Sequence, residues 1–230
     1  MFFYDYLYII LVVPMLLLAL IAQINVKTTY ARYSRETTRS GMTGCDSARM
    51  VLDANGLTYV QINMIEGELT DHFDPRTNVI NLSRAVYEGQ SAAAIGVAAH
   101  EAGHAVQYAE EYAPMRLRAF IIPATNIGAN LSFPLLLLGL LFSFPPLAYA
   151  GVIAFGLSTF FQLVTLPVEF NASHRALLAL SDSGRFDEEE VQSSRRVLRA
   201  AALTYVAALA VSFANLLRLL IIAGGSRRRR

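Results

Sequence analysis

The stretch 91-SAAAIGVAAHEAGHAVQY-108 is the most informative part of this chain for its fold and for a possible metal site. It has no proline, Ser91 is a suitable N-cap, and most of its residues favour helix, so we expect one helix over its length. His100 and His104 are four residues apart and therefore lie on one face, where both imidazoles can bind one metal ion. Glu101 follows the first histidine. This H-E-x-x-H spacing predicts a zinc site with a glutamate beside it to accept a proton from water.

Apolar residues are bunched along the chain rather than spread through it. Of 230 residues, 54% are hydrophobic and 16% are charged, a composition that argues against one or two soluble domains. The first bunch, 6–24, carries no charge and is long enough to span a bilayer core of about 30 Å. The other three bunches are approximately 120–144, 147–168 and 200–223. We therefore expect an integral membrane protein.

Basic residues indicate the orientation of these segments. The first apolar run lacks a basic n-region and a small-x-small cleavage pattern, so we expect an anchor rather than a cleaved signal peptide. Arginines follow this run, precede the second, and lie between the third and fourth, which places both polar segments in the cytoplasm. Four full crossings would put Arg227–Arg230 outside, against the same rule. The fourth run is therefore open to a crossing, a re-entrant or an interfacial arrangement.

The polar segment before the second apolar run is long enough to fold as a soluble domain. Its pattern predicts a helix over about 43–55, a strand over 57–65, a turn-rich stretch over 67–78 and a short strand over 79–82. A small sheet that leads into a helix with paired histidines is the core layout of zincin proteases. In that layout an exposed edge strand can hold an extended peptide.

The expected fold class is a mainly α membrane protein with about four transmembrane or membrane-associated helices and a small α+β zincin-like cytoplasmic domain. Five segments follow from this reading. They are an N-terminal anchor (1–25), the zincin-like domain (26–118), a transmembrane hairpin (119–169), a cytoplasmic helical segment (170–199), and a C-terminal membrane helix with a basic tail (200–230).

A catalytic zinc ion needs a third protein ligand and one open position for water. The residues with suitable donor atoms are His72, Glu169, His174 and Asp182. Glu169 is the most informative by position, because it stands at the end of the third apolar run, where a carboxylate without a partner is costly. The alternative is a glutamate that extends to water at the membrane interface.

Several segments together resemble the bacterial family of neutral zinc metallopeptidases, multi-pass membrane proteins of the YugP type. The segments that carry the resemblance are 67–76, 81–83, 86–87, 91–107 and 166–173, and the likeness extends over nearly the whole chain. The resemblance implies one zinc ion held by His100, His104 and Glu169 in a gluzincin-like site, with Glu101 as general base.

The chain departs from that family pattern at Asn171 and His174, where an acid and an arginine are expected. The first departure removes a carboxylate that could orient a ligand. The second leaves His174 as a rival or auxiliary ligand.

Two further residues are candidates for supporting roles. His72 is a candidate to stabilise the oxyanion of the intermediate, and its alternative is a surface histidine bonded to Asp71 or Asp74. Gln107 lies on the same helix face as His100 and could orient a ligand, or be a hydrogen-bonded core residue.

We therefore expect a zinc-dependent endopeptidase of the bacterial inner membrane, with its active site on the cytoplasmic side. Its partners would be a protein or peptide substrate and the lipid bilayer. A non-catalytic membrane scaffold with a structural zinc site is the alternative, and the presence of Glu101 favours the enzyme. The chain has neither a glycine-rich phosphate loop nor an aromatic, basic face for nucleic acid, so we expect no nucleic-acid partner.

Overall fold

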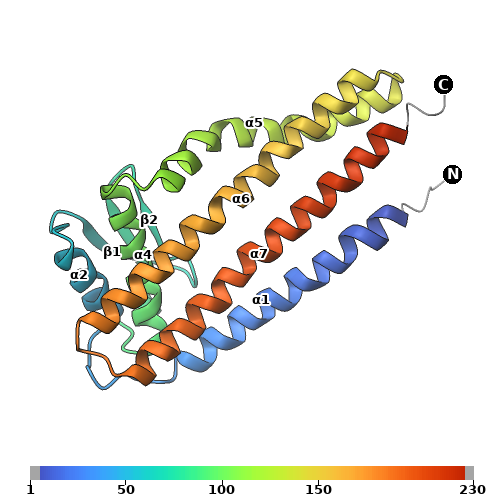
Figure 1. Ribbon diagram of the computed structural model, residues 1–230. Helices are drawn as coiled ribbons and strands as arrows, with labels where there is room; N and C mark the ends of the chain where they lie inside the picture. Colours follow the sequence, from blue (N-terminus) through green and yellow to red (C-terminus); the bar gives the residue numbers. More distant parts are fainter. Residues whose placement is uncertain (1–5, 226–230) are drawn as a thin grey trace. The chain divides into compact units, whose positions relative to one another are not determined.

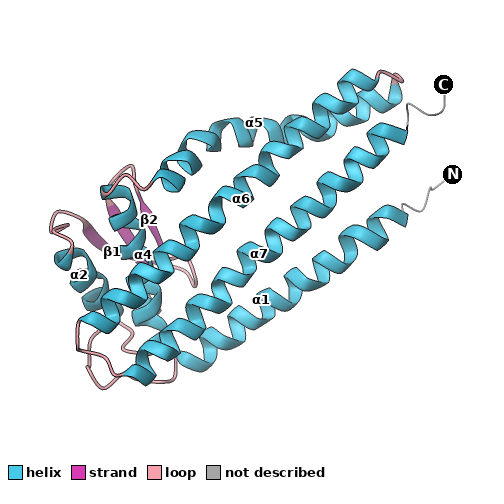
Figure 2. Cartoon of the chain, viewed as in Figure 1, coloured by secondary structure: helices cyan, strands magenta, loops and turns pink. Residues whose placement is uncertain are grey.

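The computed structural model describes residues 6–225 (Figure 1). These residues form two compact units. The first, the apolar unit, contains residues 6–22, 117–166 and 204–225. The second, the mixed unit, contains residues 23–116 and 167–203 and holds the sheet (Figure 2). All four long helices pass from one unit into the other, so each unit is described by itself.

Four long helices dominate the fold. A short π-helical segment, Tyr8–Val12, leads into α1 (Val13–Tyr33). The other three are α5 (Ala113–Leu141), α6 (Pro145–Asp182) and α7 (Glu188–Gly225). All four are long and apolar enough to cross a membrane. With the small sheet, they confirm the expected fold class of a mainly α membrane protein.

Small residues bring the helices of the apolar unit together. A side chain on Gly139 of α5 would collide with the backbone of Ala148 in α6, and one on Gly128 would lie 2.7 Å from the carbonyl oxygen of Ala154. Thr159 of α6 and Ser212 of α7 share a hydrogen bond of 2.8 Å. Close backbone approach and hydrogen bonds between helices are the interactions that hold helices together in lipid.

Helices α6 and α7 continue further than the apolar runs alone suggest. The third run extends as α6 to Asp182, and α7 begins at Glu188 and runs without interruption through the fourth run. No helix end therefore marks the boundaries expected at 169/170 and 199/200. The reason is local: the polar stretches 170–182 and 188–199 contain no proline or glycine, so the helix has nothing to stop it. The tail Arg227–Arg230 lies outside the described residues.

The mixed unit combines a small sheet with short helices. Its elements are α2 (Gly44–Ala54), β1 (Gln61–Ile65), β2 (His72–Asp74), β3 (Val79–Ser83), α3 (Arg84–Tyr87) and α4 (Ala92–Ala109). The sheet order is β1-β3-β2, with β1 parallel and β2 antiparallel to β3. Thr43 caps α2 through a reciprocal capping box with Asp46, and Ser91 caps α4, so both helix starts agree with the sequence.

Strand β2 and the single-turn helix α3 were not predicted from the sequence, and residues 67–78 were expected to be turns. Strand β2 is three residues long and stands among turn-forming aspartates, and its pairing with β3 comes from tertiary contact. His72 is therefore the first residue of an edge strand rather than part of a loop.

Helix α4 is enclosed by its neighbours in the mixed unit. Ile80 and Leu82 of β3 and Leu52 of α2 are fully buried and belong to the same apolar core as Ile95 of α4. The hydroxyl of Ser47 donates to the carbonyl oxygen of Ile95 at 3.2 Å. This packing holds α4 on several sides and fixes the position of the side chains it carries.

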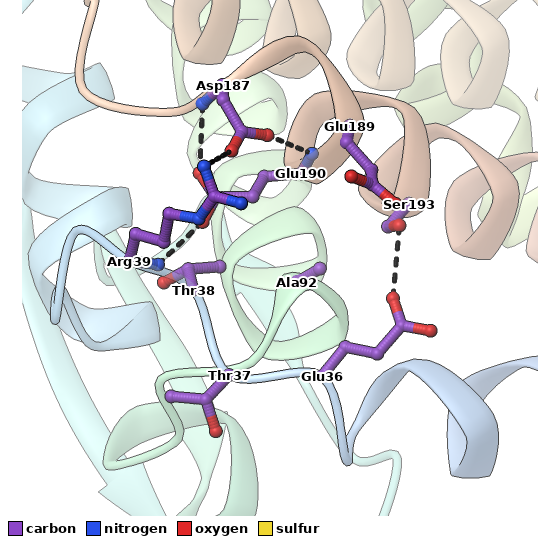
Figure 3. A pocket seen from close by; sticks show the side chains of 9 residues that line it. All are labelled: Glu36, Thr37, Thr38, Arg39, Ala92, Asp187, Glu189, Glu190 and Ser193. Carbon is purple, nitrogen blue, oxygen red and sulfur yellow. Dashed lines mark hydrogen bonds and ion pairs between the residues drawn. The ribbon is translucent and has the colours of Figure 1, made fainter.

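The segment after α1 is fastened to the starts of α4 and α7 (Figure 3). Ala92 donates its amide to the carbonyl oxygen of Glu36 at 3.1 Å. Arg39 pairs with Asp187 at 3.2 Å and donates its amide to Glu190. Asp187 and Glu190 in turn cap each other's amides at the start of α7. Arg39, Asp187 and Glu190 thus satisfy one another, which indicates a structural role for these three side chains.

Candidate metal centre

Two helices of the mixed unit bring together three potential metal ligands. His100 and His104 come from α4, and Glu169 comes from α6. One ligand atom from each residue lies within 4.8 Å of the others. Oxygen Oε2 of Glu169 is 3.4 Å from Nε2 of His100 and 3.6 Å from Nε2 of His104.

These separations fit a shared ion better than direct hydrogen bonds. Tetrahedral zinc with ligand bonds of about 2.0–2.1 Å places neighbouring ligand atoms about 3.3–3.4 Å apart. A hydrogen bond between an imidazole and a carboxylate would instead be about 2.7–2.9 Å long. Two imidazole nitrogens and one carboxylate oxygen are the donor set of a catalytic zinc site, and they leave one position for water.

The electrostatics of the cluster also favour a cation. Glu169 is 3% exposed and His104 is 8% exposed. Burial disfavours the charged form of His104, but the nearby carboxylates of Glu169 and Glu101 outweigh it and raise the pKa of His104. A buried carboxylate needs positive charge close by, and a divalent ion can supply it.

A glycine permits α4 to approach the relevant part of α6. A Cβ on Gly103 would lie 2.7 Å from the carbonyl oxygen of Ala172. Ala172 and Val168 are themselves fully buried. The close approach sets Glu169 opposite the two histidines, although 65 residues of sequence separate Glu169 from His104.

The second ring nitrogens of both histidines are also engaged. Nδ1 of His104 is 3.0 Å from Oε1 of Gln107, and Nδ1 of His100 is 3.1 Å from Oγ of Ser173. A partner at Nδ1 orients the ring and leaves Nε2 to bind a metal. The structure therefore brings Gln107 to the site, and this agrees with the predicted position of Gln107 on the same helix face as His100. Sequence reasoning missed Ser173, whose one signal is its position four residues after Glu169 on the same helix.

Glu101 lies beside the cluster but is not one of its three members. Its side chain is 8% exposed, and its Oε2 accepts a hydrogen bond of 3.0 Å from the amide of Phe73 in the edge strand β2. The carboxylate is thus held in place and shielded from bulk water next to the proposed ligands.

His72 is not brought to this cluster. Its exposed ring donates through Nδ1 to the carbonyl oxygen of Thr70 at 2.8 Å, and Nε2 accepts from the Asn81 side chain at 3.2 Å. Neighbouring Phe73 is buried, and successive side chains of a strand point to opposite faces. His72 therefore points away from the face that contacts α4. Its partners are also neither of the aspartates named above, and its oxyanion role stays a prediction without support from this placement.

The remaining candidates for the third ligand lie elsewhere. His174 and Asp182 are both exposed on α6, and the grouping found within residues 6–225 contains neither of them. Of the four residues with suitable donors, the structure places Glu169 with the two histidines.

Comparisons with known proteins cover almost the whole chain. A sequence model of the family described as "Putative neutral zinc metallopeptidase" matches residues 8–224. A protein of Bacillus subtilis (strain 168) named "Putative membrane protease YugP" is 44% identical over 216 residues, which are 94% of this chain and 96% of the relative. No solved structure matches the chain.

Proposed function

This chain belongs to the family described as "putative neutral zinc metallopeptidase", and we propose that it is a membrane-embedded zinc endopeptidase. The observation that carries this proposal is the cluster of His100, His104 and Glu169, with Glu101 held next to it but outside the ligand set. The proposed metal ligands are these three residues, around one zinc ion.

The proposed chemistry divides between the ion and the chain. What bound zinc supplies is a water whose pKa is lowered to about 7 and a polarised scissile carbonyl. With the ion bound, Glu101 would accept a proton from the attacking water and pass it to the leaving amine. The Phe73 amide fixes Oε2 of Glu101, so we assign the proton transfer to Oε1. Burial of Glu101 keeps competing water away and strengthens its interactions with the reacting groups.

We further propose that the substrates are membrane or membrane-proximal proteins, and that the site faces the cytoplasm of the bacterial inner membrane. Four helices long and apolar enough to span a bilayer support the first statement. The arginines that flank the mixed unit's segments support the second, because basic residues collect on the cytoplasmic side.

A membrane scaffold with a structural zinc ion is the second candidate. The observation in its favour is that the three proposed ligands join two helices, as a structural metal would. Structural sites usually close with a fourth protein ligand, however, and do not need a carboxylate base beside them. Both features favour the enzyme.

The deciding experiment compares the full-length wild type with Glu101→Gln, reconstituted in liposomes with a membrane-anchored reporter peptide. Zinc content and cleavage rate are measured in both. We expect equal zinc content and a loss of cleavage of about 10²- to 10⁴-fold, the usual contribution of a general base. Glu111→Gln is the matched control, because the side chain of Glu111 is 74% exposed and pairs with Arg116.

Three outcomes are informative. Equal cleavage by wild type and Glu101→Gln would overturn the mechanism. Absence of zinc from the wild type would overturn the site. Zinc in both proteins with no cleavage by either would favour the scaffold.

A further inference from the structure

Gln107 is a fully buried side chain with a partner for each end of its amide. It is 0% exposed. Its Oε1 is 3.0 Å from Nδ1 of His104. Its Nε2 donates to the carbonyl oxygen of Val168 at 2.8 Å and to Oδ1 of Asn171 at 2.9 Å. The oxygen and both N–H groups of this amide are therefore satisfied inside the protein, and one of the three partners is a proposed zinc ligand.

These partners determine which way the Gln107 amide points. The Val168 carbonyl can only accept, so the NH₂ group of Gln107 must face it. Oδ1 of Asn171 also accepts from Nε of Arg175 at 2.7 Å, which fixes this oxygen as the atom turned toward Gln107. The flipped amide would set an oxygen against two acceptors inside the protein, which is strongly unfavourable.

The orientation of Gln107 in turn determines the tautomer of His104. With Oε1 of Gln107 facing Nδ1, that ring nitrogen must carry the hydrogen, since an oxygen can only accept. Nε2 then presents its lone pair on the side of Glu169. This is the form of the imidazole that a metal ion requires.

We propose that Gln107 is a positioning residue that holds His104 in its metal-binding tautomer, and that Asn171 holds Gln107. This inference rests on the proposed zinc site. It assigns to α6 a second task beyond supplying Glu169: residues 168 and 171 lock the amide that orients the opposite ligand.

The chain of hydrogen bonds continues to the surface of the mixed unit. Arg175 donates to Asn171 and pairs with Glu110 at 2.7 Å. The side chains of Arg175 and Glu110 are 25% and 52% exposed. Each residue of this hydrogen-bonded series should therefore contribute less to the orientation of His104 than the one before it, in the order Gln107, Asn171, Arg175. The reason is that solvent competes increasingly for the partners toward the surface.

This network explains why the chain can have asparagine at position 171, where the family pattern has an acid. Asn171 acts through its oxygen, which accepts from both Gln107 and Arg175. An acid would accept at the same place. Asn171→Asp should therefore preserve the network, whereas an apolar residue of similar size should break it.

The test measures zinc affinity of the purified full chain by competition with a chromophoric chelator. Gln107→Leu should weaken zinc binding about 10- to 100-fold, the usual effect of losing the partner of a ligating histidine. Asn171→Leu should weaken it less, and Asn171→Asp should leave it within about threefold of the wild type.

A second readout separates positioning from a general loss of stability. Cobalt substituted into the site reports ligand geometry through its absorption spectrum, and Gln107→Leu should shift that spectrum. Val106→Ala is the matched control, because it truncates the neighbouring buried residue outside the network. It should lower thermal stability while leaving the affinity and the spectrum unchanged.

The outcomes distinguish this inference from the proposed function. A wild type that binds no zinc overturns both. A wild type that binds zinc, with Gln107→Leu showing the same affinity and cobalt spectrum, overturns the positioning role alone. If Gln107→Leu does not fold, Asn171→Leu against Asn171→Asp decides: equal affinities in that pair overturn the proposal.

Discussion

Helices α4 and α5 are both apolar, yet they occupy opposite environments. Fourteen of the 18 residues of α4 are buried, against five of the 29 in α5. Most of α4 is alanine, glycine and valine, and small side chains let neighbouring elements enclose it. The α5 side chains are larger, and Phe120 and Phe133 are 82% and 69% exposed. Apolar composition alone therefore does not distinguish a helix of a protein core from one that faces lipid. The size of the side chains and the length of the helix distinguish them.

Removal of the metal should produce the largest difference between α4 and α5, measured as a change in hydrogen-exchange protection. A ligand at 1,000 times its Kd stabilises the folded state by about 4 kcal/mol. Chelation of zinc should therefore reduce the hydrogen-exchange protection of α4 and leave that of residues 128–139 in α5 unchanged. The Glu169→Ala protein is the control, because chelator should have no effect on it. Equal loss of protection in both helices would contradict a site confined to α4 and α6.

A charge on an exposed aromatic residue should distinguish lipid from water. Phe133→Lys should oppose membrane insertion by about 2.5–3.5 kcal/mol if α5 faces the bilayer core. Tyr59 is similarly exposed, at 63%, but precedes β1 in the mixed unit. Tyr59→Lys should change stability by less than about 0.5 kcal/mol. Resistance to alkaline extraction, measured for both variants, tests the pair, and matching behaviour would refute the assignment of α5 to the membrane.

Two glycines with the same close contact should differ in their effect on zinc. A Cβ at Gly103 of α4 or Gly128 of α5 would lie 2.7 Å from a carbonyl oxygen of α6. Alanine at either position should cost about 1–3 kcal/mol through overpacking. Gly103→Ala should also weaken zinc binding, since it moves α4 from Glu169, whereas Gly128→Ala should not. Thermal unfolding and zinc titration measure the two effects, and a zinc defect in Gly128→Ala alone would reverse the interpretation.

The smallest effect is expected at the surface of the mixed unit. The side chains of Arg39 and Asp187 are 85% and 37% exposed, and solvent screens a pair of this kind. Arg39→Ala should lower the free energy of unfolding by less than about 0.5 kcal/mol and leave zinc affinity at the wild-type value. A marked loss of zinc in this variant would show that the fastened segment 36–39 supports α4 more than its contacts suggest.

Local patterns predicted most of the helices and two of the three members of the metal cluster. The apolar pattern predicted α2, the capping residue Ser91 predicted the start of α4, and the four-residue spacing predicted that His100 and His104 share a face. Strand β2 was missed because three residues in a turn-rich segment have too little pattern to identify a strand. The continuity of α6 and α7 was missed because hydropathy marks where a helix is apolar, not where it ends.

The sequence by itself determined that this is a mainly helical membrane protein whose paired histidines can share a metal ion, because helix periodicity and apolar run length are local properties. The tertiary structure decided which distant residues join them. Four residues had donors suitable for the third position, and only the packing of α4 on α6 set Glu169 against the histidines, with Gln107, Asn171 and Ser173 around them. No local rule relates positions more than 60 residues apart, since their distance depends on how the helices pack.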